Sequence, residues 1–390
     1  MFWSKEKRIF MDYASTTPVL KQVRQVMDKY YDKDFYNPGA IYGEALKVKK
    51  DIAEARKKVA KILGASSTGI VFTSSGTESN NLAILGAFEK SKEVFDKPHL
   101  LVSSIEHPAV LRAGKEVVRR GGEMSVVEVD EYGVVSIESL KKNLKKNTFL
   151  VSFGLANSEI GTIQPISKVA RVIKEFRKEN NSKYPLLHTD ASQAPSFLSV
   201  GLEYLQVDLL TIDASKIYGP KGSALLAIRS GVEIQPVTLG GSQERGLRAG
   251  TENPSAIVGL SKSLEIAEQD REYESNHLEK LRQEFINLVS QKIPEAIING
   301  SPDNHLPNII SISIPNTLSE FILLKLDKEG VMVSVGTTCS LDEKISGSPV
   351  ITAIGKDDLK ESTLRFSLGK QTTIDEIRIA VEKLYRVTRI

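Results

Sequence analysis

Between residues 44 and 255 the chain alternates short, continuously apolar runs with longer segments in which apolar residues recur every three or four positions. Runs of the first kind are typical of strands buried on both faces, and segments of the second kind are typical of helices with one apolar side. This alternation constrains the fold more than any other feature of the sequence. It predicts the α/β class, with a mostly parallel sheet covered by helices on both faces.

The expected elements of this region follow one another closely. Strands are predicted at 70–73, 99–104, 124–129, 148–155, 185–190 and 207–212. Helices are predicted at 44–63, 80–88 with a first turn near Thr77, 108–120 and 166–179. Gly64 follows the first of these helices as a C-cap, and Pro108 opens the third, which are the positions that glycine and proline prefer at helix ends.

The alternation of apolar strands with amphipathic helices ends near residue 255. A long charged helix is predicted there, and a smaller α+β pattern follows it. The predicted elements are a helix at 255–289, a strand at 308–314, a helix at 318–328 and strands at 331–335 and 363–367. Thr373 and Glu376 have the spacing of a capping box and are expected to open the last helix.

Two domains are expected, because 390 residues exceed what one ordinary hydrophobic core organises. We predict a large cofactor-binding domain at 15–255. The small domain consists of residues 1–14 and 256–390 and carries Cys339 and Arg365.

Composition narrows the class of protein. The net charge is +3, and basic residues alternate with acidic ones, which favours a solvated mixed surface over a nucleic-acid-binding face. The single cysteine excludes an internal disulfide and fits a reducing compartment. No apolar run is long enough to span a bilayer, and the five histidines show no metal-ligand spacing. A cytoplasmic protein without a membrane, nucleic-acid or metal partner is expected.

Three polar segments lie where predicted strands end. Residues 73–80 are rich in serine, glycine and threonine and begin a helix, whose free N–H groups favour a phosphate. Asp190 ends an apolar strand, and Lys216 follows another. Each segment alone also fits a loop, a cap or a surface lysine. Together they suit pyridoxal 5'-phosphate (PLP), which needs a lysine for its Schiff base, an acid facing its pyridine nitrogen and a phosphate anchor, here Gly76 and Thr77.

Three further residues have a functional and an ordinary interpretation. His107 follows a strand, either as a simple loop histidine or as a ring that stacks on the cofactor and passes protons. Cys339 is either a small buried side chain or, in its stretch of Gly, Ser and Thr, an exposed nucleophile. Arg365 interrupts an apolar strand and either faces solvent or binds a carboxylate.

Read together, these residues resemble the cysteine desulfurases of the class V aminotransferase family, which are fold type I PLP enzymes. The matching segments run nearly from one end of the chain to the other. They are 11–18, 37–38, 72–82, 106–107, 157–161, 188–193, 216–222, 244–251 and 364–369, together with Cys339. The resemblance implies the fold, the cofactor and the reaction of that family.

The resemblance implies how the cofactor ring is held. Lys216 would form the Schiff base, Asp190 would face the pyridine nitrogen, and His107 would stack on the ring as an acid/base. Asn157 and Gln193 would hydrogen-bond the ring and its phenolic oxygen.

The resemblance also implies the phosphate contacts. Gly76, Thr77 and Ser215 would bind the phosphate, and Thr251 would reach it from the other subunit of a homodimer. One position departs from the family, because the usual Ser-Gly-His before the lysine is Asp-Ala-Ser here, beginning at Asp213. A carboxylate facing a phosphate is unfavourable unless it turns away or pairs with an arginine.

The implied reaction converts L-cysteine to L-alanine. Arg365 and Asn157 would bind the substrate, and Cys339 would take its sulfur as a persulfide for a sulfur-accepting protein in iron–sulfur cluster assembly or tRNA thiolation. The sequence leaves the identity of that acceptor open. A selenocysteine lyase or another class V enzyme is an alternative, and a degenerate homologue acting as a binding subunit is an alternative of a different class, favoured by Asp213 alone.

Overall fold

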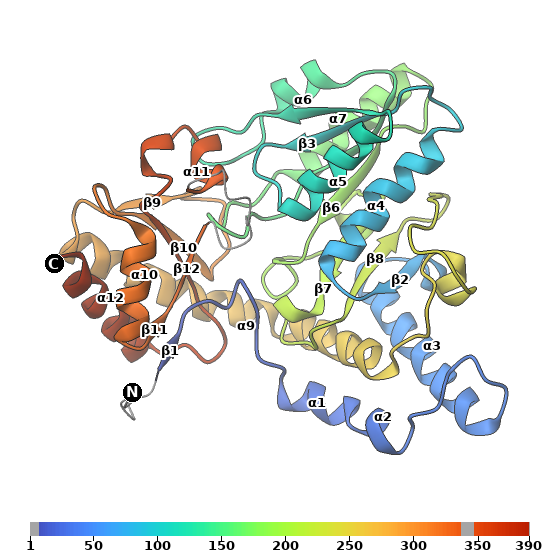
Figure 1. The fold of residues 1–390 in the computed structure, drawn as a ribbon, viewed down its shortest axis with the longest axis horizontal. Coiled ribbons are helices and arrows are strands. Elements are labelled where there is room, and N and C mark those ends of the chain that lie inside the picture. The colour runs from blue at the N-terminus through green and yellow to red at the C-terminus, as the bar shows by residue number, and fades with distance from the viewer. Residues whose placement is uncertain (1–7, 337–346, 390) are drawn as a thin grey trace.

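The centre of the molecule is a seven-stranded sheet. The structure is a computed structural model that describes residues 8–336 and 347–389 (Figure 1). The strands are β2 (Ile70–Thr73), β3 (His99–Ser103), β4 (Glu123–Val127), β5 (Thr148–Ser152), β6 (Leu186–Asp190), β7 (Leu209–Asp213) and β8 (Ala224–Ile228). Their order is β2-β8-β7-β6-β5-β3-β4, and only β8 runs antiparallel to its neighbours. The predicted mostly parallel sheet is therefore confirmed.

Helices cover both faces of this sheet, as the sequence predicts. They are α3 (Gly43–Leu63), α4 (Gly76–Ser91), α5 (Pro108–Arg119), α6 (Ile137–Asn143), α7 (Ile166–Glu179) and α8 (Leu202–Leu205). One apolar core joins α3 and α7 to the sheet, and a second core joins α4 and α5 to it from the other side. Every strand of this sheet except the edge strand β4 is thus buried on both faces, which explains the continuous apolar runs.

A smaller sheet and its helices form the second part of the molecule. Its strands are β9 (Ile297–Asn299), β10 (Ile309–Ser313), β12 (Ser334–Val335) and β13 (Thr363–Ser367), all antiparallel to their neighbours. A separate pair of parallel strands joins β1 (Ile9–Phe10) to β11 (Val331–Met332). The helices of this part are α10 (Ser319–Lys328), α11 (Pro349–Ala353) and α12 (Ile374–Thr388). The predicted capping box opens α12.

Helix α9 (Pro254–Lys292) passes from one part of the molecule to the other (Figure 1). Its first half places Ile257 and Leu264 in the core of the large sheet. Its second half places Leu278 and Phe285 in the core of the small sheet. Helices α1 (Lys21–Met27) and α2 (Lys29–Asp32), which follow β1 in the chain, pack against the same helix. The division of the chain at residue 255 stays a prediction.

Two differences from the expected elements have a clear physical cause. The predicted strand at 331–335 is two strands, because β11 pairs with β1 whereas β12 pairs with β13. Strand β8 was not predicted, although it is fully buried. It comes directly after a Gly-Pro turn and runs antiparallel, so no helix precedes it to mark it as part of the alternating pattern.

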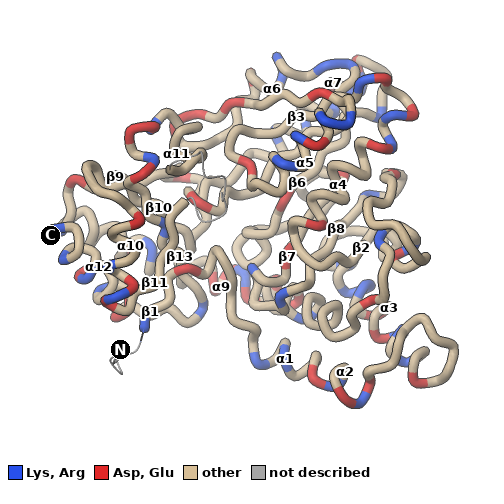
Figure 2. Tube along the Cα trace, in the orientation of Figure 1, with Lys and Arg blue, Asp and Glu red and all other residues tan. Residues whose placement is uncertain are grey.

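Charged residues of both signs are interspersed along the whole trace (Figure 2). Ion pairs link neighbouring turns of the helices, for example between Glu116 and Arg119 on α5. In the described part of the chain, no helix combines the length and the apolar character needed to cross a membrane.

Candidate active site

One pocket collects most of the predicted site residues. It has a volume of about 510 Å³ and lies where β2, β3, β5, β6 and β7 end. The predicted residues that line it are Gly76, Thr77, His107, Asn157, Asp190, Gln193, Lys216 and Arg365. Ligands of open α/β sheets bind at this edge, outside the carboxyl ends of the strands.

Asp190 ends β6 and is held by hydrogen bonds on both carboxylate oxygens. Oδ1 accepts from the backbone N–H of Ser192 at 2.9 Å and from its hydroxyl at 2.6 Å. Oδ2 accepts from Asn80 Nδ2 on α4 at 2.7 Å. Because donors from two elements fix the carboxylate, Asp190 presents a defined anion to the pocket.

Lys216 follows β7 and points toward the N-terminal segment of the chain. Its ammonium donates to the carbonyl oxygen of Ala14 at 3.0 Å and to that of Ser15. Gln193 donates to the same Ala14 oxygen at 2.9 Å. Residues far apart in sequence therefore hold the amine at the pocket wall, where an aldehyde could reach it.

His107 is the N-cap of α5. Its Nδ1 accepts a hydrogen bond from the backbone N–H of Ala109 at 3.1 Å, so the neutral ring carries its proton on Nε2. Burial among the pocket walls lowers the pKa of the imidazole, and the charge of Lys216 adds to this, although Asp190 opposes it. A neutral imidazole that lines the pocket suits stacking and proton transfer.

Glu106 lies beside His107 as a fully buried carboxyl group. It accepts from the Ser103 hydroxyl at 2.6 Å and from the Gly154 N–H at 3.0 Å. Burial raises the pKa of Glu106 to about 7, and the nearby charge of Asp190 also raises it. The sequence motif contains this residue, but sequence reasoning gave it no role.

The start of α4 and the segment after β7 meet at Asp213. Its Oδ2 accepts from the backbone N–H of Gly76 at 3.0 Å. Its Oδ1 accepts from the N–H of Ser215 at 2.8 Å and from the Ser215 hydroxyl at 2.7 Å. The Asp213 carboxylate therefore binds backbone N–H groups at the start of α4 and beside Lys216. Ser215 does not line the pocket.

Arg365 comes from β13 of the small sheet and faces the pocket, as the functional interpretation expected. Its Nη2 forms an ion pair with Asp12 at 2.7 Å, and its Nη1 donates to the Ser158 carbonyl oxygen at 3.0 Å. Its Nε is buried and has no hydrogen-bond partner among the described residues. A buried N–H donor without an acceptor is costly, so the site fits a ligand that brings one, such as a carboxylate.

Asn157 is largely occupied by the protein itself. Its Oδ1 accepts from the backbone N–H groups of Glu159 and Ile160, each at 2.9 Å, and its Nδ2 donates to the Ile105 carbonyl oxygen at 3.0 Å. The side-chain nitrogen keeps a second N–H for a ligand. Asn157 therefore shapes the turn after β5 as well as the pocket.

Two predicted residues lie elsewhere. Thr251 is exposed and does not line the pocket of its own chain. Its role in the site of a partner subunit stays a prediction. Cys339 lies outside the described residues, although Gly336, three positions earlier, lines the pocket.

The pocket fits PLP by its own contents. It contains an amine, a fixed carboxylate and a helix start with small residues, which are the groups that this cofactor requires. A Cβ at Gly76 would come within 3.3 Å of both Asp213 Oδ2 and Ser192 Oγ, so glycine keeps the cradle open. Among the described residues no cluster of metal-ligating side chains competes with this interpretation.

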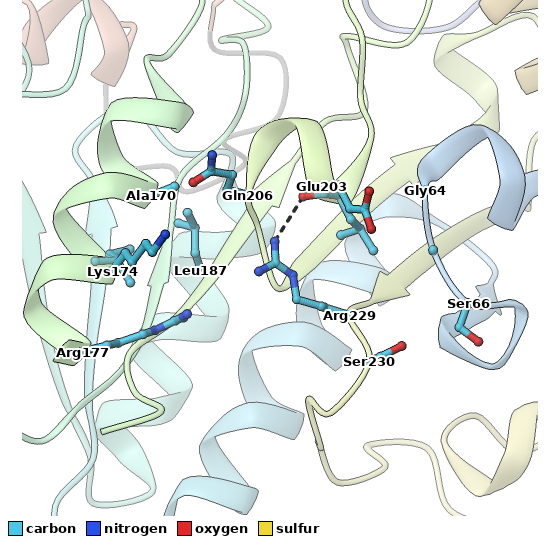
Figure 3. Close-up of a pocket in the computed structure, with 13 residues that line it drawn as sticks. Gly64, Ser66, Ala170, Lys174, Arg177, Leu187, Glu203, Gln206, Arg229 and Ser230 are labelled. Atoms are coloured by element: carbon cyan, nitrogen blue, oxygen red, sulfur yellow. Dashed lines mark hydrogen bonds between the residues drawn. The ribbon is translucent and has the colours of Figure 1, made fainter. Parts of the chain in front are cut away.

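A larger cavity of about 850 Å³ lies at the opposite edge of the sheet, beside the start of β6 and the end of β8 (Figure 3). None of the described predicted site residues lines it. Its arginines are engaged in the fold: Arg177 pairs with Asp208, and Arg229 donates to the Leu202 carbonyl oxygen. The cavity also contains a lysine and an acid, Lys174 and Glu203, but these come from the helices α7 and α8 and not from the carboxyl ends of the strands.

Sequence reasoning missed three contributors to the site. Asn80 orients Asp190, Ser192 holds its other oxygen, and Asp12 pairs with Arg365. Asn80 and Asp12 lie in the matching segments 72–82 and 11–18, so the sequence marked them as candidate site residues without showing their roles. Their partners are distant in sequence, so only the fold shows what they contact.

The fold and the pocket together define a PLP enzyme of fold type I. The chain belongs to the aminotransferase class-V family, whose sequence model matches residues 9–379. It is 40% identical to the cysteine desulfurase IscS of Dictyoglomus turgidum over 98% of this chain and 95% of that one. A solved structure of a NifS-like protein superposes with a TM-score of 0.90 at 35% identity, over 98% of this chain and 99% of the other.

A further solved structure shows a relative with a bound amino acid. SspA in complex with cysteine matches with a TM-score of 0.79 at 31% identity, over 92% of this chain and 98% of that one. The predicted fold class and family are therefore confirmed.

Proposed function

We propose that the protein is a PLP-dependent cysteine desulfurase that converts L-cysteine to L-alanine and transfers the sulfur to Cys339 as a persulfide. The observation that carries the proposal is the convergence of Lys216, Asp190, His107 and Arg365 on one pocket. Relatives at up to 40% identity over nearly the whole chain are cysteine desulfurases. The likeness covers both sheets and the pocket between them.

Four groups of this chain would hold the cofactor. Lys216 binds its aldehyde carbon, Asp190 faces its ring nitrogen, and His107 covers one face of its ring. The start of α4 at Gly76 and Thr77 receives its phosphate. Bound PLP supplies an electron sink that makes the substrate's Cα proton acidic and weakens the bond to sulfur.

Arg365 is the proposed carboxylate anchor for L-cysteine. Its Nε, which has no partner among residues 8–336 and 347–389, and its Nη2 can together face two carboxylate oxygens, while the contact of Nη1 with Ser158 keeps the guanidinium in place. Asp12 shares this guanidinium in the structure, so substrate binding loosens or shares that ion pair. A relative binds cysteine, which fits this assignment.

The proton movements are assigned to Lys216 and His107. The free Lys216 amine would accept the Cα proton of the substrate, and the carbonyl oxygens of Ala14 and Ser15 keep this amine near the pocket. His107 carries a proton on Nε2 that it can give to the departing carbon fragment. Both groups are placed by backbone contacts and need little reorganisation.

The sulfur step is assigned to Cys339. Its thiolate attacks the substrate sulfur, so a sulfur–sulfur bond forms while the carbon–sulfur bond breaks, and the carbon fragment takes up a proton and leaves as L-alanine. Gly336 lines the pocket, and three residues of chain span at most about 11 Å. A sulfur-accepting protein of iron–sulfur cluster assembly or tRNA thiolation then takes the sulfur from the persulfide.

A homodimer is part of the proposal. Exposed apolar side chains gather in one segment around α2 and the start of α3, which is unusual for a surface that faces only water. They are Tyr31, Phe35, Ile41, Tyr42 and Leu46. Ile41 is 91% exposed. Thr251, which is exposed and does not line its own pocket, would then reach the partner's phosphate site.

The test compares wild-type protein with Cys339→Ala, supplied with L-cysteine, PLP and a reductant. We expect alanine and sulfide from the wild type, and retained cofactor colour with at least about a hundredfold loss of activity in the variant. Unchanged activity in the variant would assign the protein to lyases that release the chalcogen without an enzyme thiol. Failure of the wild-type chain to bind PLP would favour a catalytically degenerate homologue.

A further inference from the structure

The carboxylate of Asp213 occupies the place where the proposed function puts the cofactor's phosphate. Gly76 N–H, Ser215 N–H and the Ser215 hydroxyl all donate to it, at distances between 2.7 and 3.0 Å. The first of these donors opens α4, a helix of 16 residues. Asp213 thus uses the N–H groups that attract anions at a helix start.

The geometry leaves little room for both anions. Gly76 is buried, and the position of its missing Cβ already lies 3.3 Å from Asp213 Oδ2. The three hydrogen bonds to Asp213 all come from uncharged donors, so they orient the carboxylate without neutralising it. A phosphate at Gly76 and Thr77 would meet a negative charge, and it would lose one backbone donor to that charge.

We propose that Asp213 is a built-in competitor of the cofactor's phosphate. Its carboxylate fills the cradle and accepts from the first N–H of α4, and PLP binds only by displacing it. This inference rests on the proposed function for the identity of the cofactor, but the competition itself concerns any phosphate. Its consequence is a cofactor that is held more weakly and exchanged more readily than the rest of the pocket would allow.

Two variants separate charge from hydrogen bonding. Asp213→Asn keeps the size and one acceptor oxygen but removes the charge. Asp213→Ser removes the charge and shortens the side chain, so a hydroxyl donor replaces the competitor. We expect both variants to bind PLP at least about tenfold more tightly than the wild type, and the serine variant to bind it most tightly.

The experiment uses the full chain after removal of the cofactor. Calorimetric titration with PLP gives the dissociation constant, and thermal melting with inorganic phosphate gives the protection that phosphate alone provides. We expect the cofactor-free serine variant to melt below the wild type, because the backbone N–H groups of Gly76 and Ser215 lose their carboxylate acceptor. Phosphate should then stabilise it more than it stabilises the wild type.

Asp130→Asn is the matched control. Asp130 also accepts two backbone N–H bonds, from Tyr132 and Val134 at 2.9 Å each, but it does not line the pocket. This control should leave the PLP dissociation constant unchanged.

The outcomes distinguish the two proposals. If the wild type binds PLP and neither Asp213 variant binds it more tightly, the competition is disproved while the proposed function stands. If no form binds PLP but phosphate protects the Asp213 variants more than the wild type, the competition stands and the proposed function fails. Equal phosphate protection in all forms overturns the competition in either case.

Discussion

Glu106 is a buried acid whose charge state changes near neutral pH. Burial raises its pKa to about 7 from an ordinary value of 4.5, and its contacts come from Ser103 and Gly154. The folded chain therefore keeps this proton between pH 4.5 and 7, where the unfolded chain has released it. Protonation favours folding most below pH 4.5, and this contribution is lost as the pH rises through about 7.

We predict that Glu106→Gln abolishes the loss of stability that Glu106 causes in the wild type as the pH rises. Relative to the wild type, the free energy of unfolding of the variant should rise by about 3 kcal/mol between pH 4.5 and pH 8, because a shift of 2.5 pH units is worth about that much. Urea unfolding across this range measures it. The buried His188, whose pKa is lowered to about 4 by burial, changes stability in the opposite sense but does so equally in both proteins. Glu320→Gln, at an exposed position, serves as the control. The prediction would be contradicted if Glu106→Gln showed the same dependence of unfolding free energy on pH as this control.

Arg365 offers a second test at this scale. Arg365→Lys keeps the charge but loses the two-pronged geometry and the Nε donor. We expect KM for L-cysteine to rise about ten- to a hundredfold, with a smaller change in kcat and unchanged binding of PLP. Steady-state alanine production measures both constants. The surface substitution Arg378→Lys should change neither, and a fall confined to kcat would argue against carboxylate binding.

How far the site could be predicted depends on the range of the contacts involved. Lys216, Asp190 and His107 each follow a strand, and the carboxyl ends of parallel strands share one edge, so their convergence follows from local patterns. The contacts of Asp213 with Gly76 and of Arg365 with Asp12 join positions 137 and 353 residues apart. No periodicity encodes such pairs, so the sequence alone did not show which groups contact Asp213.

At the scale of elements, a short loop is held in an unusual backbone conformation. In the turn at Gln243–Gly246, Glu244 and Arg245 have φ angles of 45° and 58°, which are uncommon for residues with side chains. The buried Glu244 carboxylate accepts two hydrogen bonds from Arg56 on α3, each at 2.7 Å, and one from the N–H of Phe72 on β2. This carboxylate ties the loop to a helix and to the edge strand of the sheet.

We predict that Glu244→Gln lowers the free energy of unfolding by about 3 kcal/mol, because it leaves the charge of Arg56 buried without its partner. Chemical denaturation measures the loss. The surface substitution Glu54→Gln breaks an exposed pair with Lys57 and should cost less than about 1 kcal/mol. Equal effects of the two substitutions would show that the buried pair does not hold the loop.

Elements with strong periodicity were predictable almost to the residue. The helix at 166–179 and the strands at 70–73 and 363–367 have the predicted bounds. Short elements were not found, such as β1 and β9, because two or three residues show no period. Their strand character comes from partners that are distant in the sequence.

At the scale of the whole molecule, two exposed apolar regions are candidates for contact with another chain. One is the segment around Phe35 and Ile41, and the other is the outer face of α10, with Phe321 58% exposed and Leu324 66% exposed. The homodimer is assigned to the first region, because the proposed role of Thr251 requires a partner on the large-sheet side.

We expect the double substitution Phe35→Asp and Ile41→Asp to produce monomers, because charges at a self-complementary interface meet their own copies across the symmetry axis. Light scattering after size-exclusion chromatography gives the mass. Leu324→Asp is the matched control and should leave the dimer intact. Dimers in the first variant and monomers in the second would move the interface to α10.

The pairing of β1 with β11 sets an order of events when the chain is made. Ile9 pairs with Val331 and Phe10 with Met332, so β1 leaves the ribosome more than three hundred residues of synthesis before its partner strand. At cellular rates of translation, the delay is on the order of tens of seconds. Ile9 and Met11 remain without their core during that time. A strand of only two residues exposes few unpaired backbone groups with which another chain could pair. The short length of β1 therefore limits aggregation of the nascent protein.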